Sequence, residues 1–248
     1  QKTAYEILTC DWSSDVCSSD LTPSLQNVLA RGRGTPTVFT LTSNPFLANA
    51  GTSDTDHLPF VTGAYLGQPA RQAIEAVKLL LPNARRIGTL FTPGEINSVF
   101  NKETLETAAK AAGFEFVAVG ISTSSEVNDA AIALAARQLD ALTQVTDNLI
   151  AGSFPAVMAA ANRARLPVIT YSPSSADMGP LLVVARDYFD NGVASGLIAA
   201  RVLRGERPGD IPFLPVPDLN YVVNMKVADA YGIRIPEELV AKASRVIR

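Results

Sequence analysis

Hydrophobic and polar positions follow two alternating periods from Thr22 to the end of the chain. Short apolar runs rich in β-branched residues are separated by longer stretches with apolar residues every three or four positions. The predicted strands are Thr37 to Leu41, Arg86 to Phe91, Phe114 to Val119, Ala141 to Val145, Pro167 to Tyr171 and Leu181 to Ala185. The predicted helices are Gln68 to Leu81, Ser98 to Ala112, Ser125 to Gln138, Leu149 to Ala164 and Asn191 to Leu203. This order predicts an α/β protein with parallel sheets.

The predicted units are distributed unevenly around Thr62-Gly63-Ala64, with about one unit before this point and four after it. We therefore expect two lobes, of which the amino-terminal lobe is incomplete.

Residues 11 to 21 form a polar string with neither a strand nor a helix period, so we expect no folding element there. Back-translated, the string resembles a common sequencing-adapter oligonucleotide. A Ser- and Asp-rich disordered linker is the alternative. We expect residues 1–21 not to be native, and an export signal and further units to be encoded upstream.

Composition excludes several classes of function. The 248 residues carry 18% charged residues and a net charge of -3, which gives no footprint for binding nucleic acid. No apolar run reaches the roughly 18 residues that span a bilayer. Cys10, Cys17 and His57 have no metal-ligand spacing, so we predict no metal site and no cofactor.

The turns that follow the predicted strands are the places to look for a site, because ligands bind outside the carboxyl ends of parallel strands. Asn97 and Ser98 follow Arg86 to Phe91 and, with backbone N–H groups of the next helix, suit a carboxylate. The alternative is that Ser98 caps that helix. Asp147 follows Ala141 to Val145 and could pair with an ammonium group, or serve as an N-cap.

Three further turns offer weaker candidates. Asn44 follows the first predicted strand, where Asn-Pro also marks an ordinary turn. Tyr171 and the Asp187-Tyr188-Phe189 segment could line a pocket, although aromatic residues more often pack in the core. No nucleotide-binding glycine motif or nucleophile motif is present, and we expect His57 to be a solvated loop residue.

The segment from Arg86 to Ser98 resembles the "RIGVLYNPGEANS" segment of ABC-transporter substrate-binding proteins, a family that includes tryptophan- and tyrosine-type binding proteins. The resemblance continues downstream through Thr146-Asp147-Asn148, Leu203 to Pro208 and Asn224-Met225-Lys226. Upstream, Thr22-Pro23, Val38-Phe39-Thr40 and Val61-Thr62-Gly63 resemble the family's "ATP", "VFT" and "NVTGV" segments.

The resemblance implies a type I periplasmic-binding-protein fold: two Rossmann-like lobes with parallel sheets that hold ligand in the cleft between them. The implied division is 22–64, the remnant of the amino-terminal lobe; 65–186, the carboxy-terminal lobe; 187–212, a helix returning to the first lobe; and 213–248, a return strand and terminal helix. The implied ligand-binding residues are Thr22, Asn44, Asn97, Ser98, Asp147 and Asp187.

Two departures from the family pattern bear on the ligand. Relatives commonly have Thr-Asp-Pro where this chain has Ser43-Asn44-Pro45, so one carboxylate is lost. Arg186 stands where relatives have a small or apolar residue, which suggests a more acidic ligand.

The resemblance implies an extracytoplasmic receptor that binds an amino-acid-like solute and partners ABC permease subunits, with no catalysis. The receptor would be periplasmic or extracellular, with contact to the membrane only through the permease or a lost lipid anchor. Two alternatives remain: the effector domain of a LacI-type regulator, marked by an upstream helix-turn-helix, and a Rossmann-like enzyme, which requires a nucleotide-binding turn or a nucleophile with its base.

Overall fold

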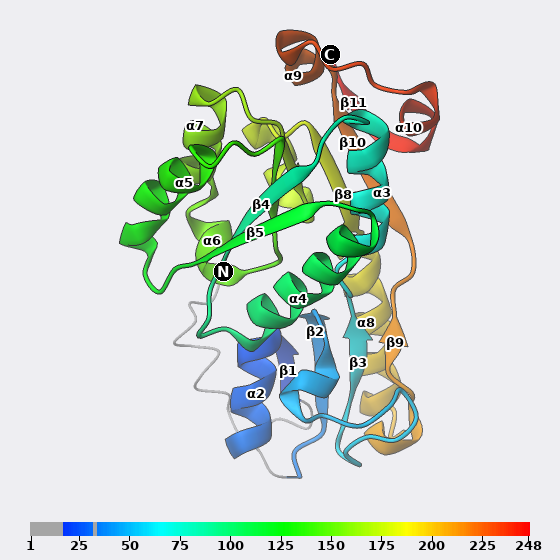
Figure 1. Ribbon diagram of the computed structural model, residues 1–248. Coiled ribbons are helices and arrows are strands. Elements are labelled where there is room, and N and C mark those ends of the chain that lie inside the picture. The colour runs from blue at the N-terminus through cyan, green and yellow to red at the C-terminus, as the bar shows by residue number, and fades with distance from the viewer. Residues whose placement is uncertain (1–16, 32–33) are drawn as a thin grey trace. The chain divides into compact units, whose positions relative to one another are not determined.

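The computed structural model describes residues 17–31 and 34–248, and its chain divides into two units (Figure 1). Unit 1 comprises the chain up to Gly67 together with Tyr188–Pro217, and unit 2 comprises Gln68–Asp187 with Asp218–Arg248. Both are α/β structures built on parallel sheets, as predicted.

Unit 1 contains a four-stranded sheet in the order β1-β2-β3-β9, in which every neighbouring pair is parallel. Its strands are β1 (Cys17–Asp20), β2 (Thr37–Thr42), β3 (Val61–Tyr65) and β9 (Leu214–Pro215). Its helices are α2 (Thr22–Arg31), α8 (Tyr188–Leu203) and the 3-10 turns η1 (Pro45–Ala48) and η4 (Pro208–Asp210). Helix α2 was not predicted from the sequence.

The two faces of this sheet are covered by different helices. Val38 of β2 packs with Ile198 and Val202 of α8, whereas the next residue, Phe39, packs with Leu25 of α2. This alternation is the period-2 geometry of a strand whose two faces are both buried. Gly63 lies opposite Phe39, where an added Cβ would stand 2.2 Å from the Phe39 carbonyl oxygen. The close approach of β2 and β3 therefore requires glycine.

Strand β1 corrects our expectation that residues 11 to 21 form no element. Cys17 and Ser19 are buried, Ser18 is exposed, and the strand pairs in parallel with β2. A parallel ladder uses backbone groups, so small serine side chains do not prevent pairing. Cys10 and the rest of the string before residue 17 lie outside the described residues, and the foreign origin of residues 1–21 stays a prediction.

His57 is half-buried and its ring stacks on Phe213 at 4.2 Å between ring centroids. The expectation of a solvated loop histidine was wrong, because the ring packs on an aromatic residue that sequence spacing did not place beside it.

Unit 2 contains a seven-stranded sheet in the order β11-β10-β8-β7-β6-β4-β5, parallel except for the β8–β10 pair. Its strands are β4 (Arg86–Phe91), β5 (Glu115–Gly120), β6 (Ala141–Gln144), β7 (Val168–Thr170), β8 (Leu182–Arg186), β10 (Leu219–Asn224) and β11 (Ala243–Ile247). Its helices are α3 (Ala70–Leu80), α4 (Ile96–Ala111), α5 (Val127–Ala135), α6 (Asn148–Gly152), α7 (Phe154–Arg163), α9 (Met225–Tyr231) and α10 (Glu237–Lys242), with turns η2 (Ser124–Glu126) and η3 (Pro173–Met178).

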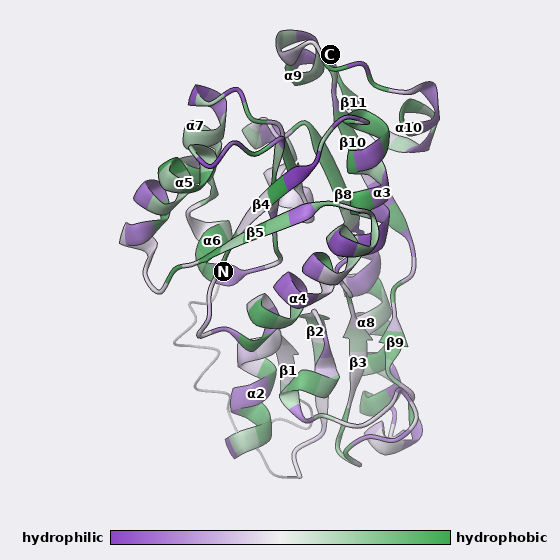
Figure 2. Ribbon diagram, viewed as in Figure 1, coloured by the Kyte–Doolittle hydropathy of each residue, from purple (hydrophilic) through white to green (hydrophobic). Residues whose placement is uncertain are grey.

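Helices also cover both faces of this sheet. Ile87 of β4 belongs to the core formed with α3 and α4, whereas Leu90 of the same strand belongs to the core formed with α5 and α7. Helices α3 and α4 carry both hydrophobic and hydrophilic stretches, as amphipathic helices do (Figure 2). Each strand of the sheet centre is therefore buried on two sides.

The predicted helix from Leu149 to Ala164 is two helices, α6 and α7, separated at Ser153. Pro155 stands in the first turn of α7, where its missing N–H is tolerated, and it cannot continue α6. The break keeps α6 as a separate five-residue helix directly after the β6 turn.

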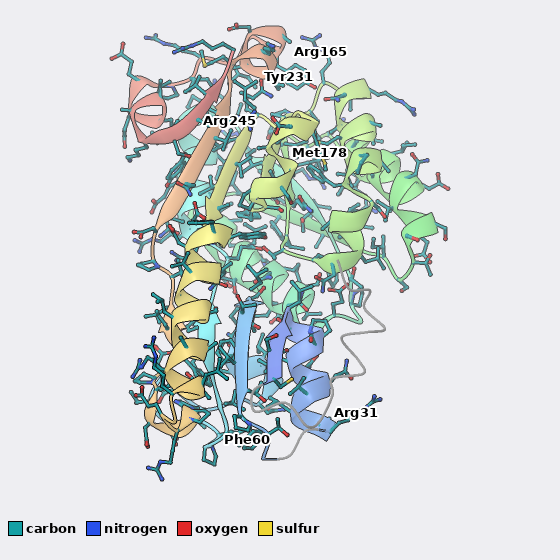
Figure 3. All side chains as sticks on the ribbon, turned by 180° about the vertical axis from the view of Figure 1, so that it is seen from behind. Arg31, Phe60, Arg165, Met178, Tyr231 and Arg245 are labelled. Carbon is teal, nitrogen blue, oxygen red and sulfur yellow. The ribbon has the colours of Figure 1, made fainter. Side chains whose placement is uncertain are left out.

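The end of the chain is joined to the rest of unit 2 by polar contacts. The Arg245 guanidinium pairs with Asp177 of η3, and the Arg165 guanidinium lies 5.4 Å from the Tyr231 ring centroid. Figure 3 labels Arg165, Tyr231 and Arg245 in this part of unit 2. The last strand, β11, was not predicted from the sequence. Within residues 17–31 and 34–248, no helix has both the length and the apolar character to cross a bilayer.

Candidate functional site

The order of strands in unit 2 places a switch point between β4 and β6. Strand β4 lies between β5 and β6, so the chain leaves β4 toward one side of the sheet and returns to the other side. Crevices at such points, outside the carboxyl ends of the strands, are where doubly wound sheets bind ligands. The β4–α4 and β6–α6 turns are thus the first place to look for a site.

The two turns are joined through the backbone N–H of Thr92. The Thr92 nitrogen lies 2.8 Å from Ser98 Oγ and 3.0 Å from Asp147 Oδ2, and both oxygens accept from it. Ser98 and Asp147 are almost fully buried. The structure therefore brings together two residues that are 49 positions apart in the sequence and were both predicted for the site.

Asp147 serves as a helix cap in addition to any role toward ligand. Its Oδ1 accepts a 2.7 Å hydrogen bond from the Ile150 nitrogen, which makes Asp147 the N-cap of α6. The capping alternative for Asp147 is confirmed. The corresponding alternative for Ser98 is wrong, since α4 begins at Ile96 and its N-cap residue is Glu95.

Two asparagine side chains of α4 meet the backbone of the β6–α6 turn. Asn97 Nδ2 and Asn101 Nδ2 donate to the same carbonyl oxygen, that of Thr146, at 3.4 and 2.9 Å. Their amide oxygens are buried and accept no hydrogen bond within the described residues, and the same is true of Thr92 Oγ1. Three oxygens without partners therefore lie in the turn after β4 and the first turns of α4.

The site also carries uncompensated negative charge. The Glu95 carboxylate, half-buried, accepts from Asn97 Nδ2 at 3.3 Å and Asn148 Nδ2 at 2.8 Å. In the described ranges, no Lys, Arg or His side chain forms an ion pair with Glu95 or Asp147. Two carboxylates without a cation, beside oxygens without donors, favour a positively charged hydrogen-bond donor.

The first N–H groups of α6 are already occupied. Glu95 accepts from the Asn148 and Leu149 nitrogens, and Asp147 accepts from that of Ile150. Asn97 likewise uses its amide nitrogen within the protein, so that its partnerless atom is an acceptor. This differs from our expectation that Asn97 donates to a carboxylate, and it arises because Thr146 O takes the donor.

The predicted residues of unit 1 occupy ordinary structural positions. Thr22 is the buried first residue of α2, and Asn44 Oδ1 accepts from the Phe46 nitrogen at 2.9 Å, which caps η1. Asn191 of α8 was missed: its Oδ1 accepts from Thr40 Oγ1 and the Leu41 nitrogen, both at 2.8 Å. Its buried Nδ2 has no acceptor among the described residues.

Asp187, the remaining predicted residue, belongs to unit 2 and is half-buried. Its Oδ2 accepts a 2.5 Å hydrogen bond from Asn220 Nδ2 of β10.

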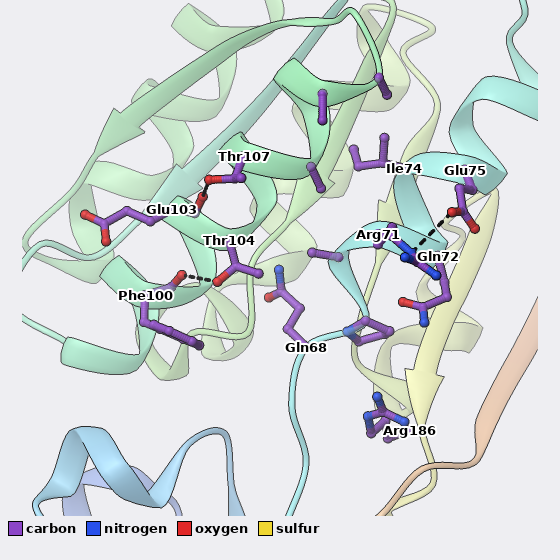
Figure 4. A pocket seen from close by; sticks show the side chains of 15 residues that line it. Gln68, Arg71, Gln72, Ile74, Glu75, Phe100, Glu103, Thr104, Thr107 and Arg186 are labelled. Carbon is purple, nitrogen blue, oxygen red and sulfur yellow. Dashed lines mark hydrogen bonds and ion pairs between the residues drawn. The ribbon is translucent and has the colours of Figure 1, made fainter. Parts of the chain in front are cut away.

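A groove of about 780 Å³ runs between α3 and α4 on unit 2 (Figure 4). Gln68 lies in this groove and also reaches the polar cluster, because its Oε1 accepts from the Thr146 nitrogen at 2.8 Å. Arg186 also lines this groove, and the expectation that it favours a more acidic ligand stays a prediction. Tyr171 packs in the core with α3, and burial raises the pKa of its phenol.

Three polar residues of this region were missed from the sequence: Gln68, Glu95 and Asn101. Asn101 could have been found, since it follows Asn97 by four residues and so shares its helix face. Glu95 is part of the quoted segment, but its bonds to the β6–α6 turn depend on strand order, which the sequence does not reveal.

Solved structures of similar fold define the class of this protein. An ABC domain in complex with L-Trp from Streptococcus pneumonia superposes with a TM-score of 0.90 at 27% identity, covering 98% of this chain and 86% of that one. A ligand-free, open substrate-binding protein with adhesive properties from Clostridium difficile gives a TM-score of 0.72 at 29% identity, covering 94% and 78%. These neighbours have the periplasmic-binding-protein fold, which confirms the predicted class.

The family follows from the sequence. The model for ABC transporter substrate binding proteins matches residues 8–247. A tyrosine-binding protein of Clostridioides difficile (strain R20291) is 34% identical over 203 residues, which are 82% of this chain and 59% of that protein. The chain therefore belongs to the ABC transporter substrate-binding protein family. It spans about three fifths of the length of the curated relatives it matches.

Proposed function

We propose that this chain is the ligand-binding part of an extracytoplasmic receptor for an ABC importer, and that unit 2 binds the ammonium group of an amino acid. Binding of an ammonium group is supported by the excess of hydrogen-bond acceptors over donors at the switch point between β4 and β6. Two carboxylates, those of Asp147 and Glu95, accompany three buried oxygens without donors, on Thr92, Asn97 and Asn101.

An ammonium group fits this excess in both charge and hydrogen bonding. It carries three N–H donors and one positive charge, and it accepts nothing. A buried carboxylate that gains such a partner forms a charge-assisted hydrogen bond, which is about twice as strong as a neutral one. The partnerless oxygens of Thr92 and Asn97 would each gain a donor, so binding would remove the cost of leaving them unpaired.

The identities of the relatives support an aromatic amino acid as the ligand. One is named for binding tyrosine and another was solved with L-Trp. The backbone N–H groups that open α4 stay the predicted partner of the ligand carboxylate. Thr22, Asn44 and Asp187 stay predicted contacts, and so does the position of the ligand between the lobes.

Transport without catalysis is the proposed role. ABC permease subunits are the proposed partners, and the periplasm or cell exterior, with or without a lipid anchor, is the proposed location. The match to a solute-binding family over residues 8–247 does not favour the LacI-type regulator.

Isothermal titration calorimetry tests the proposal directly. The protein is titrated separately with L-tyrosine, L-tryptophan and the neutral polyol myo-inositol as a control. We expect at least one of the two amino acids to bind with micromolar or tighter affinity, and myo-inositol not to bind. Binding of the polyol with no heat from either amino acid would contradict the ligand class.

A further inference from the structure

The Glu95 side chain forms its hydrogen bonds with a neighbouring helix and not with the helix that it precedes. Glu95 is the N-cap residue of α4, yet its carboxylate makes no capping bond to that helix. It reaches instead to the neighbouring helix α6, where it accepts from the Asn148 nitrogen at 3.1 Å and the Leu149 nitrogen at 3.2 Å. One carboxylate thus links the β4–α4 turn to the β6–α6 turn.

The same carboxylate also contacts two side chains. Asn148 Nδ2 donates to Oε2 at 2.8 Å, and Asn97 Nδ2 donates to it at 3.3 Å. Glu95 therefore receives four hydrogen bonds while only half-buried. Hydrogen bonds to a charged acceptor are stronger than neutral ones, so these four bonds restrict both turns.

The orientation of Asn97 is the functional consequence. With Nδ2 held by Glu95 Oε2 and Thr146 O, the amide can present only its oxygen to a ligand. An unrestrained amide could rotate and present donors instead, which would oppose an ammonium group. Glu95 would thus determine whether Asn97 presents a hydrogen-bond acceptor or a donor to the ligand.

We infer that Glu95 is a positioning residue: it orients Asn97 and fixes the Thr146-Asp147-Asn148 turn so that unit 2 presents acceptors to the ligand. This inference rests on the proposed function. Glu95 need not touch the ligand, and it acts through Asn97 and Asp147.

The chain offers a matched control at the other end of the same strands. Asp140 Oδ2 accepts from the Arg85 and Arg86 nitrogens at 2.7 and 2.8 Å, so it too joins the β4 and β6 connections through one carboxylate. Asp140 lies at the amino ends of the strands, away from the switch-point turns. Asp140→Asn should disturb the fold locally without changing ligand affinity.

The experiment compares Glu95→Gln with Asp140→Asn, using whichever of L-tyrosine and L-tryptophan the unmodified protein binds. We expect Glu95→Gln to weaken binding about tenfold, because a neutral amide holds the Asn97 side chain and the β6–α6 turn less firmly than a carboxylate does. Asn148→Ala, which removes one of the four donors, should weaken binding by a smaller factor. Equal affinities for Glu95→Gln and the unmodified protein would overturn the inference.

A double-mutant cycle separates positioning from general destabilisation. If Glu95 acts through Asn97, Glu95→Gln should cost much less affinity in an Asn97→Ala background than alone. Additive losses would overturn the claim that Glu95 acts by orienting Asn97.

Amide hydrogen exchange in the ligand-free protein tests the link made by Glu95 separately from the proposal that the protein binds an amino acid. Glu95→Gln should speed exchange at Asn148 and Leu149 and leave Arg85 and Arg86 unchanged, with the reverse for Asp140→Asn. Unchanged exchange at Asn148 would refute the link itself. If the link is present but neither amino acid binds the unmodified protein, it is the proposed function that fails, and with it the role of Glu95 toward ligand.

Discussion

At both ends of strands β4 and β6, carboxylates join the two connections by accepting backbone N–H groups. The two ends differ in which buried polar atoms have no hydrogen-bond partner. At the amino ends, exposed Asp140 accepts two backbone N–H groups. At the carboxyl ends, Asp147 and Glu95 also accept backbone N–H groups, but Thr92, Asn97 and Asn101 add three buried oxygens that have no donor among the described residues. Arg86 Nε at the amino ends also has no partner in that part of the chain, yet it is a donor.

We attribute the difference to the proposed ligand site at the carboxyl ends. A buried acceptor without a donor costs about 1 to 3 kcal/mol in the folded state. Folded proteins keep few such groups, and a cluster of them at a topological switch point indicates a ligand that supplies the missing donors.

Among the variants of these two ends, Asp147→Ala should cause the largest loss of ligand affinity. Removing the carboxylate should weaken binding of an amino acid by roughly 2 to 5 kcal/mol, because it leaves the ammonium group without a buried charge partner. Calorimetry measures the loss, and thermal unfolding reports the separate cost of the missing α6 cap. Unchanged affinity would rule out Asp147 as the ammonium partner.

Thr92→Val should change affinity and stability in opposite directions. The substitution keeps the side-chain shape and removes the partnerless Oγ1. We expect the ligand-free protein to become more stable by about 1 kcal/mol, and ligand binding to weaken by about 1 to 2 kcal/mol. Chemical denaturation and calorimetry measure the two quantities. A loss of stability together with normal binding would show that Oγ1 has a partner in the folded protein.

Asp140→Asn should affect stability alone. We expect a loss of about 1 kcal/mol in the free energy of unfolding, since the bonds to the Arg85 and Arg86 nitrogens are charge-assisted but exposed to solvent. Denaturant titration measures it, with ligand affinity as the control. Weakened binding in this variant would remove the distinction between the two ends.

The smallest effect is expected at the exposed Asp177–Arg245 pair, far from both turns in the sequence. A hydrogen bond from Arg245 holds the pKa of Asp177 below its ordinary value of 3.8. A carboxyl group whose pKa is lowered by folding stabilises the folded protein at pH values above its ordinary pKa. This added stability is lost as the pH falls through the folded-state pKa. The difference in unfolding midpoint between Asp177→Asn and the unmodified protein should therefore be small at neutral pH and vanish in acid. A difference that persists in acid would mean that the pair is not its source.

Much of the fold could be predicted from hydrophobic periodicity. The predicted bounds of β4 match the structure, because its apolar run is buried on two faces and ends at Pro93-Gly94. The α6–α7 break and the short strands β1 and β11 were not predicted. A Pro in the first turn of a helix and a four-residue serine-rich strand give weak local signals, and backbone pairing decides them.

The site was predictable in part for a related reason. Strand-end turns pointed to Asn97, Ser98 and Asp147, and the structure joins these three through the two turns. Whether the site presents donors or acceptors could not be predicted, because it depends on which atom of the Asn97 amide bonds to the Thr146 carbonyl and Glu95. Those contacts can be known only once the order of β4 and β6 in the sheet is known.

We propose that the carboxyl ends of β4 and β6 bind an ammonium group, and comparing an amino acid with its deaminated counterpart tests this most directly. The affinities are measured for whichever amino acid the unmodified protein binds: L-tyrosine against 3-(4-hydroxyphenyl)propanoate, or L-tryptophan against 3-(indol-3-yl)propanoate. We expect the deaminated compound to bind at least about 100-fold more weakly, as loss of a buried charge pair implies. Equal affinities would contradict it, since the acceptors of unit 2 would then play no part in binding.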